Sequence, residues 1–509
     1  MKPFWPGRAI LPICTLAAAL SACTATPPPS TTTAPAFTAA PSNTSAPTAL
    51  PTSQPTAQPT AQPTAQPTAT PTPYPSLQSS GPYLVYAKEQ DDQQVLVIMD
   101  PDGAGRKIVV LPEGAYIHSL DTLSPDGSWL AFHIGTKDAK SLSLNLLNVW
   151  SGDVQPIAKL LSDDYPSNFG KAAELLMKSD LSFSTWDANA LANQLQFAFD
   201  NGIYALDWSP EGRYLAFAGE MDGPSSDLYV YDTVLQSIGR LSAGPEEIQS
   251  INWSPDGRWI LHSSTYWSGA GYSVTYHAAN VEAGTLNRLL VASPWTYSWV
   301  SPTQFLAFDS QNGPGDYNLR SVNVATGQIT SLWKDPFNRP ATDVEGGLML
   351  ISTVERLRED GPFGLYLINL SSGVSVKIND LPFWEIRFWG IGGVPFIAHS
   401  TYENNDTALA IFANASTAPI DKKWFGADVS PDRQWIIADE VYDANLQPAA
   451  RLPISVQADA NIWRPDSKGK FLLSGADLYY IPIPVGRPVL VDTNVPKSDN
   501  FDYTWVIGK

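Results

Sequence analysis

Cysteine is almost absent from this chain of 509 residues, which contains only Cys14 and Cys23. Two cysteines cannot build a disulfide framework or a cysteine-rich metal cluster. A folded domain in this chain must therefore be stable through its hydrophobic core alone. A chain of this length is long enough to bury such a core.

Positive charge is also scarce. Lys and Arg together number 31, Asp and Glu together number 50, and the formal net charge is −19. A charge this negative argues against nucleic acid as a partner and against direct binding to anionic lipid. It favours solubility, and it permits cationic partners or divalent metal ions.

The motifs of common catalytic and cofactor sites are missing. The sequence contains no Gly-x-Ser-x-Gly nucleophile elbow, no His-Glu-x-x-His zinc motif, and no Walker or dinucleotide-binding glycine pattern. The histidines are scattered without the spacing of a ligand set; they are His118, His133, His262, His277 and His399. We therefore predict no catalytic residue, no metal site and no cofactor.

What the chain does contain is a recurring turn sequence, Ser-Pro-Asp-Gly, between two apolar runs of strand length. Sharp copies begin at Ser124, Ser209 and Ser254, and degraded copies begin at Ser301, Ser430 and Arg464. Ser, Pro, Asp and Gly in this order suit the four positions of a type I turn. The copies at Ser209, Ser254 and Ser301 are 45 and 47 residues apart. This spacing is typical of one four-stranded blade of a β-propeller.

These units resemble the WD40-like PD40 repeats of TolB-type bacterial propellers. The shared form is an aromatic or apolar residue, Ser-Pro-Asp-Gly, an apolar strand, and a Leu-Tyr-Val-type strand that ends in Asp, as in Asp227–Asp232. The resemblance extends from about Tyr83 to the C-terminus. It implies an all-β propeller and, by analogy with TolB-type relatives, protein contacts in envelope complexes.

The number of blades follows from the repeat. Complete units begin near eight positions, which are His118, Ile203, Ile248, Tyr297, Ala341, Ile386, Phe425 and Asn461. We expect the strands of residues 83–111 to join the C-terminal strand at 501–506 and close the ring, because closure protects sheet edges. We predict eight blades, with seven or nine as the alternatives. If the blade formed by the joined termini is counted separately from these eight units, the number of blades is nine.

One insertion interrupts the repeat at about residues 163–200. Two segments in it, 169–177 and 187–195, have helical composition, and Asp187 is a suitable N-cap. We expect two short helices that pack on the edge of a blade. Alternatively, they cover a central channel or offer a docking surface.

The N-terminus has the pattern of a bacterial lipoprotein. Residues 1–22 form a predicted signal peptide with Lys2 and Arg8 before an apolar stretch, 9–20, that is too short to span a membrane. Leu20-Ser21-Ala22-Cys23 matches the lipobox of bacterial lipoproteins. That resemblance implies cleavage before Cys23, lipidation of its sulfur and acylation of its new amine. The alternative is an ordinary secretory signal.

A low-complexity segment follows. Residues 23–80 comprise the lipidated cysteine and a stretch rich in Pro, Thr, Ala and Gln, which lacks the apolar bulk to bury a core. We expect a disordered or extended tether that holds the propeller, residues 81–509, off the membrane. The predicted location is therefore extracytoplasmic, with the lipid as the only attachment to the bacterial membrane or cell surface.

Candidate binding residues lie in the loops between the second and third strands of each unit. In a propeller these loops share one rim with the connections between blades, and loops on a rigid scaffold are where binding usually resides. Six of the candidates are acidic: Glu220, Asp222, Asp309, Glu355, Glu403 and Asp439. Two are aromatic, Trp267 and Tyr272, and can stack on sugars or anchor a protein. We predict one acidic, aromatic-studded rim as the binding face.

Three functions remain open at this stage, and the third, a non-catalytic sensor subunit encoded beside a transport or secretion system, differs from the first only in its partner. The first is a monomeric binding module that holds a protein or a glycan at the cell envelope. The second is a glycan-active enzyme with two carboxylates facing each other across the central channel. The sequence cannot separate them, because the residues that line the channel depend on the register of each blade.

Overall fold

The computed structural model describes residues 76–77, 80–138, 140–162, 202–267, 272–291, 298–310, 317–333, 341–343, 347–353, 364–370, 372–380, 385–391, 394–400, 407–412, 414–419, 428–432, 434–437, 440–443, 447–450, 460–484, 487–496 and 503–506. The predicted signal peptide, Cys23, nearly all of the predicted tether and the predicted helical insertion lie outside these residues. No helix in the described part of the chain is long and apolar enough to cross a membrane.

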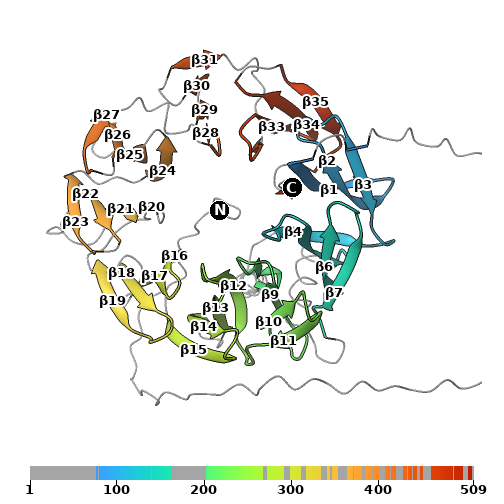
Figure 1. The fold of residues 1–509 in the computed structure, drawn as a ribbon, viewed down its shortest axis with the longest axis horizontal. Helices are drawn as coiled ribbons and strands as arrows, with labels where there is room; N and C mark the ends of the chain where they lie inside the picture. The colour runs from blue at the N-terminus through green and yellow to red at the C-terminus, as the bar shows by residue number, and fades with distance from the viewer. Residues whose placement is uncertain are drawn as a thin grey trace, which may run out of the picture.

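The described residues form four-stranded antiparallel sheets arranged in a ring (Figure 1). Eight sheets each use four consecutive strands. The first three sheets contain β4 (Tyr116–Leu123), β5 (Trp129–Gly135), β6 (Leu142–Asn148) and β7 (Val154–Lys159); β8 (Leu206–Trp208), β9 (Tyr214–Gly219), β10 (Asp227–Asp232) and β11 (Ser237–Arg240); and β12 (Glu247–Trp253), β13 (Trp259–Trp267), β14 (Tyr272–Asn280) and β15 (Thr285–Val291). The next three contain β16 (Ser298–Ser301), β17 (Gln304–Ser310), β18 (Tyr317–Asn323) and β19 (Ile329–Trp333); β20 (Ala341–Asp343), β21 (Leu348–Thr353), β22 (Gly364–Asn369) and β23 (Ser375–Asn379); and β24 (Glu385–Ile391), β25 (Val394–Ser400), β26 (Thr407–Ile411) and β27 (Thr417–Pro419). The last two contain β28 (Asp428–Val429), β29 (Trp435–Ile437), β30 (Val441–Asp443) and β31 (Pro448–Ala450); and β32 (Ala460–Trp463), β33 (Gly469–Ser474), β34 (Asp477–Pro482) and β35 (Val489–Thr493). A short 3-10 helix, η1 (Gly202–Tyr204), precedes β8.

The two ends of the domain share one further sheet. It contains β1 (Tyr83–Gln90), β2 (Gln93–Met99), β3 (Arg106–Val110) and the C-terminal β36 (Tyr503–Val506). β36 pairs with β1, with Tyr83 opposite Val506, and takes the place that the first strand has in the other sheets. The predicted all-β propeller, its eight contiguous units and the joining of its termini are thus confirmed. With the joined termini, the described residues form nine four-stranded sheets.

The repeated sequence forms the predicted turn between the first and second strands. In the first sharp copy, the Gly127 amide donates to the Ser124 carbonyl at 2.8 Å. The Ser124 hydroxyl donates to Asp126 at 2.6 Å and accepts from the Trp129 amide at 3.0 Å. Gly127 has φ +73°, a region that favours glycine. These hydrogen bonds lie within six residues, so the local sequence is sufficient to specify the turn.

The hydrophobic core lies between neighbouring sheets. The second and third strands are apolar on both faces, because each sheet is covered on both sides by its neighbours in the ring. In β9, for example, Phe217 packs with Tyr229 toward the sheet β4–β7, whereas Ala216 and Ala218 pack toward the sheet β12–β15. Burial of this apolar surface is the main stabilising term for the ring.

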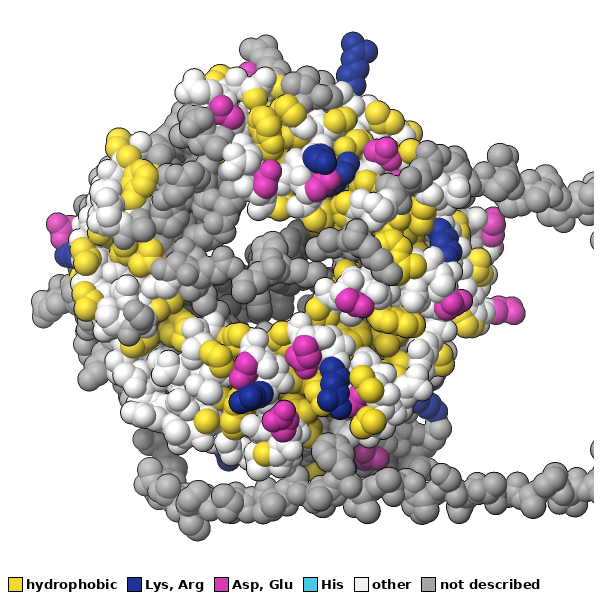
Figure 2. Space-filling model, viewed as in Figure 1, with side chains coloured by type: hydrophobic (Ala, Val, Ile, Leu, Met, Phe, Trp, Pro, Cys, Tyr) yellow, Lys and Arg dark blue, Asp and Glu magenta, His cyan; other side chains and the backbone are white. Residues whose placement is uncertain are grey.

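The ring has two rims that carry different kinds of loops. The loop rim bears the loops between second and third strands, such as residues 220–226, and the connections between sheets. The turn rim bears the Ser-Pro-Asp-Gly turns and the turns between third and fourth strands. On the face drawn in Figure 2, acidic and basic side chains gather over the part of the ring that contains β9–β12.

Candidate functional site

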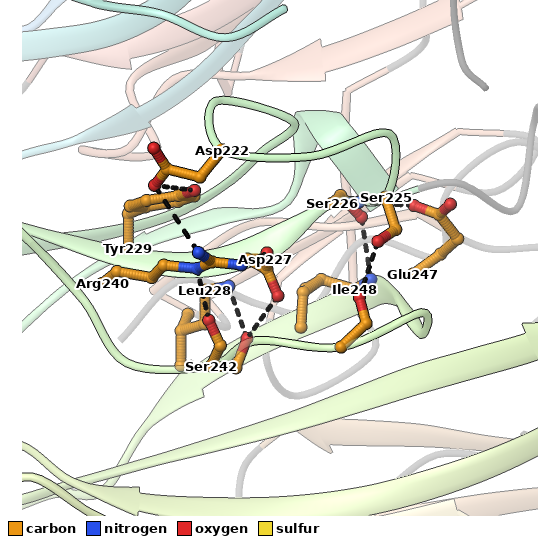
Figure 3. A network of polar contacts seen from close by, with 11 residues as sticks. Asp222, Ser225, Ser226, Asp227, Leu228, Tyr229, Arg240, Ser242, Glu247 and Ile248 are labelled. Atoms are coloured by element: carbon orange, nitrogen blue, oxygen red, sulfur yellow. Dashed lines mark hydrogen bonds and ion pairs between the residues drawn. The ribbon is translucent and has the colours of Figure 1, made fainter. Parts of the chain in front are cut away.

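A network of polar side chains joins two neighbouring sheets at the loop rim (Figure 3). It connects the loop between β9 and β10 with the segment that leads from β11 into β12. The Ser226 amide donates to Glu247 at 2.7 Å, and the Ile248 amide donates to the Ser226 hydroxyl at 2.9 Å. The Ser225 hydroxyl donates to the Gly244 carbonyl at 2.6 Å. We call Asp222, Ser225, Ser226, Asp227, Tyr229, Arg240, Ser242 and Glu247 the loop-rim network.

An ion pair joins the exposed Arg240 to Asp227, which is a buried member of this network. Arg240 Nη2 donates to Asp227 Oδ2 at 2.5 Å, and Arg240 Nε donates to the Ser242 carbonyl at 2.8 Å. The Ser242 hydroxyl donates to Asp227 at 3.3 Å. Burial raises the pKa of Asp227 to about 6, although Arg240 opposes this shift. These bonds hold the guanidinium group in a single orientation.

Asp222 is the exposed part of the network. Its side chain is 55% exposed, and its carboxylate accepts a hydrogen bond from the Tyr229 hydroxyl at 2.9 Å. Arg240 Nη1 lies 3.9 Å from the same carboxylate. Burial, followed by this hydrogen bond to Asp222, raises the pKa of Tyr229 above its usual value. The result is a solvent-facing acceptor held by a buried phenol and a nearby cation. It can accept hydrogen bonds from a ligand hydroxyl, amide or ammonium group.

A second polar group lies in the adjoining sheet. The Ser264 hydroxyl donates to Glu246 and lies 3.3 Å from His277 Nδ1, while His277 Nε2 lies 3.9 Å from Glu246. His277 stacks on His262 with ring centroids 5.1 Å apart. Burial, assisted by His277, lowers the pKa of His262 to about 3, so this ring is neutral at physiological pH.

An exposed aromatic residue lies on the same strand as Ser264, nearer the loop rim. Tyr266 lies two residues beyond Ser264 in β13, and adjacent Thr265 is the register partner of Glu247. Tyr266 is 42% exposed. Because residues two apart in a strand share a face, Tyr266 extends the face of Ser264 toward the loop rim. It directly precedes Trp267, one of the two predicted aromatic residues.

The predicted site residues have different placements. Asp222 lies in the loop-rim network. Trp267 and Tyr272 are register partners at the ends of β13 and β14, and Asp309 is the register partner of Asn318; the side chains of these three predicted residues lie outside the described part of the structure. Glu355, Glu403 and Asp439 also lie outside the described residues.

Glu220 has a different role from the one its sequence suggests. It is only 1% exposed, and its backbone amide donates to the Leu160 carbonyl at 2.8 Å. Its carbonyl accepts from the Ser162 amide at 3.0 Å. Glu220 is therefore an interior residue where two neighbouring sheets meet, rather than an exposed rim carboxylate.

Sequence reasoning missed one cluster, which joins the first two strands of the sheet β4–β7 to η1. His133 Nδ1 lies 2.6 Å from Asp121 Oδ2 and 2.9 Å from the Ser119 hydroxyl. The Tyr204 hydroxyl lies 3.2 Å from His118 Nδ1, and the Tyr204 ring meets His133 edge-on. Ser119 and His133 are register partners, a pairing that the sequence alone does not reveal because the register shifts on both sides of it.

This cluster does not have the geometry of a nucleophilic triad. In a triad, the serine and the acid bind opposite nitrogens of the histidine. Here both groups meet Nδ1, and the described residues place no hydrogen-bond partner on the buried Nε2. His133 is also completely buried. The cluster therefore orders the strand β4 rather than presenting a nucleophile. In the described part of the chain, no group of three His, Cys, Asp or Glu residues is placed to hold a metal ion.

Comparisons with known proteins find a distant structural likeness. No protein-family model and no curated protein matches the chain. Among solved structures, TolB from Acinetobacter baumannii is 16% identical with a TM-score of 0.28, and the match spans 58% of this chain and 62% of TolB, less than two thirds of its length. A eukaryotic initiation factor is 13% identical over 84% of this chain and 99% of its own, with a TM-score of 0.49. The β-propeller domain of the Trilobed protease from Pyrococcus furiosus is 14% identical over 75% of this chain and 100% of its own, with a TM-score of 0.34. These are distant similarities to propeller proteins.

Proposed function

We propose that this chain is a lipid-anchored, extracytoplasmic propeller that binds a protein or a glycan of the cell envelope at its loop rim. The lipobox and the tether predicted from the sequence support the location. The propeller supports binding in general, because its rims display many loops on a rigid scaffold.

The observation that carries this proposal is the fixed, exposed carboxylate of Asp222. An exposed Asp side chain ordinarily samples several rotamers, and ordering it on binding costs free energy. The Tyr229 hydroxyl already holds this one at 2.9 Å. The exposed Tyr266 adds an aromatic surface on the adjoining sheet. A preorganised acceptor and an aromatic ring suit recognition of a hydroxylated or amide-bearing ligand.

The alternative is a glycan-active enzyme in the central channel. It requires two carboxylates that face each other about 5–10 Å apart. In the described residues, the polar cluster on β4 contains a single carboxylate, Asp121, which is committed to His133 and Ser119. Binding at the loop rim rests on a described pair, Asp222 and Tyr229, and is the function that we favour.

The test is a capture experiment with the full-length chain and a detergent extract of the envelope. The wild type is compared with Asp222→Asn combined with Tyr266→Ser, and with Trp267→Ala combined with Tyr272→Ala. Asp256→Asn on the turn rim serves as the matched control. The captured proteins are quantified by mass spectrometry, and the captured glycans are quantified by sugar analysis.

A protein or glycan that the wild type and Asp256→Asn retain, and that the loop-rim variants lose at least about fivefold, supports the proposal. The captured molecule is then purified and titrated against the same variants. Equal retention by all variants contradicts a binding site at the loop rim and favours a site in the central channel.

A further inference from the structure

A cleft of about 250 Å³ lies at the turn rim, on the opposite side of the ring from the loop-rim network. It is formed where the sheet β4–β7 meets the sheet β8–β11. The turns that begin at Ser124 and Ser209 contribute to it, and so does the turn between β10 and β11. Those elements are held by the hydrogen bonds of the repeat, so the cleft is largely preformed.

Aromatic side chains form much of the wall of this cleft. Trp129, Trp208 and Tyr231 all line it. Trp208 and Tyr231 are buried, and the Trp208 indole donates to the Thr122 carbonyl at 3.2 Å. The rings are thus fixed in place. Of the three rings, only Trp129 is partly exposed, and the electron-rich face of a Trp ring attracts cations most strongly.

The charges around the cleft have one sign. Asp126 supplies this charge, the Glu211 carboxylate lies toward Gly257 of the next sheet, and the described lining includes no Lys, Arg or His. Burial opposes ionisation of Asp126, but hydrogen bonds from Ser124 and Ser128 hold the pKa of its carboxyl below the usual value. The cleft therefore carries negative charge at neutral pH. Its electrostatic complement is a cation.

Arg213 is the basic residue next to this lining in the chain. It follows Glu211 and Gly212 in the chain, and its Nη2 lies 2.8 Å from Asp232. Its guanidinium carbon also lies 4.8 Å from the centre of the Tyr214 ring. This arginine pairs with Asp232, also interacts electrostatically with Glu211, and is absent from the cleft lining.

An exposed apolar pair stands beside the cleft. Val234 is 72% exposed and Leu235 is 67% exposed, and they occupy the turn whose neighbours Thr233 and Gln236 line the cleft. The amides of both residues donate to Asp232 Oδ1, at 2.8 and 3.0 Å, which fixes the turn. An exposed apolar pair next to an acidic, aromatic cleft is typical of a protein-binding surface, because a protein partner can cover both. A small free amine would fill the cleft but leave Val234 and Leu235 exposed to solvent.

We propose that this cleft receives a lysine or arginine side chain of a protein partner, and that an apolar residue beside that side chain packs on Val234 and Leu235. The charge of the cleft, its aromatic walls and the adjacent apolar turn together specify this occupant. The site is separate from the loop rim and does not depend on the function proposed for it.

The probe is the peptide acetyl-Leu-Arg-Leu-amide, titrated against the full-length chain in detergent micelles and followed by saturation-transfer NMR. The matched peptide carries citrulline, which keeps the shape of arginine and removes its charge. We expect the arginine peptide to bind roughly tenfold more tightly than the citrulline peptide, as a partly desolvated cation–aromatic contact predicts. Micelles without protein provide the blank.

Two protein variants locate the binding. Asp126→Asn removes one charge from the cleft and keeps an oxygen that can accept the Ser124 hydrogen bond; we expect about tenfold weaker binding. Val234→Ser combined with Leu235→Ser tests the apolar turn, and we expect severalfold weaker binding of the arginine peptide. Asp256→Asn is the control, because Asp256 accepts the same bond from Ser254 at 2.7 Å and does not line the cleft.

The proposal is supported if binding depends on the arginine charge, falls in the Asp126 and Val234–Leu235 variants and is unchanged in Asp256→Asn. It is overturned if the citrulline peptide binds equally, if no peptide binds at millimolar concentration, or if all variants bind alike. Binding of methyl β-glucoside that is lost in Asp126→Asn, without binding of the arginine peptide, would identify a glycan site and also overturn it.

Discussion

The ammonium nitrogen of Lys88 in β1 lies 2.9 Å from a carboxylate oxygen of Asp492 in β35, although 404 residues separate them in the chain. The Tyr86 hydroxyl also donates to Asp492, and Arg106 Nη1 lies 3.3 Å from it. Asp492 thus joins the sheet that contains both termini to the last sheet of consecutive strands. This contact and the pairing of β1 with β36 are where the ring closes.

Replacement of Asp492 by Ala should destabilise the propeller by about 3–5 kcal/mol at pH 7, because it leaves buried cations without their partner. The urea denaturation midpoint measures this loss. Asp380→Ala is the control: Asp380 pairs with Lys377 but is 89% exposed, so we expect little change. Equal midpoints for the two variants would contradict a role for Asp492 in closure.

The pH dependence of this contribution has a definite sign. Burial would raise the pKa of Asp492, but hydrogen bonds from Tyr86 and Lys88 hold it below its usual value. A carboxyl group whose pKa is lower in the folded state stabilises the fold above the unfolded value of about 3.9 and loses this effect as the pH falls through the folded pKa. The difference between wild type and Asp492→Ala should therefore shrink below about pH 4.

Asp227 should act in the opposite direction. Its pKa of about 6 in the folded protein exceeds the unfolded value of about 3.9, so the folded state takes up a proton as the pH falls from 7 to 5. This uptake should stabilise the wild type by about 1 kcal/mol over that range. Asp227→Asn cannot titrate and should lack the gain, as measured by urea denaturation at both pH values. Asp222→Asn, at an exposed site, should retain it; an identical slope in wild type and Asp227→Asn would rule out this titration.

Alanine variants of two glycines with similar φ angles allow the cost of backbone strain to be measured separately from the cost of steric crowding. Gly103 has φ +78° and Gly114 has φ +76°. A Cβ at Gly103 would collide with the side chain of Val491, whereas a Cβ at Gly114 would meet open space. We expect Gly114→Ala to cost about 1 kcal/mol from the left-handed backbone alone. Gly103→Ala should cost about 1–3 kcal/mol more from overpacking. Equal denaturation midpoints for the two variants would show that the Val491 side chain moves away from the new Cβ at little cost in stability.

Lipidation is tested by the two cysteines of the chain. Cys23→Ser should abolish incorporation of an alkyne-tagged fatty acid and release the protein from the membrane fraction, because the predicted acceptor sulfur is lost. Cys14→Ser should remain labelled, since Cys14 belongs to the predicted signal peptide. In-gel fluorescence of the tagged protein provides the measurement. Labelling that persists in Cys23→Ser would contradict the lipobox prediction.

Some features were predictable because their causes are local. The turn that begins at Ser124 is held by bonds from Ser124, Asp126 and Gly127, which lie within one short segment. Pairing of the two ends was also predictable, because an unpaired edge is unfavourable and the C-terminal strand had no other partner in the repeat.

Other features required the fold. The pairing of Glu220 with Leu160 and Ser162 crosses the insertion, and no local pattern announces it. The contact of Ser119 with His133 depends on a register that shifts twice between β4 and β5. Because a one-residue shift moves a side chain to the other face of a strand, alternation in the sequence could not place this pair.

The sequence by itself determined the repeat, its turns, the all-β class and the closure by the two ends, because these rest on local hydrogen bonds and on apolar strands that need covered faces. Only the tertiary structure decided that Asp222 is a fixed surface carboxylate while Glu220 is buried. Only it brought Asp126, Trp129 and Tyr231 together at the turn rim. Such groupings depend on how neighbouring sheets pack, which is set by many distant side chains acting together.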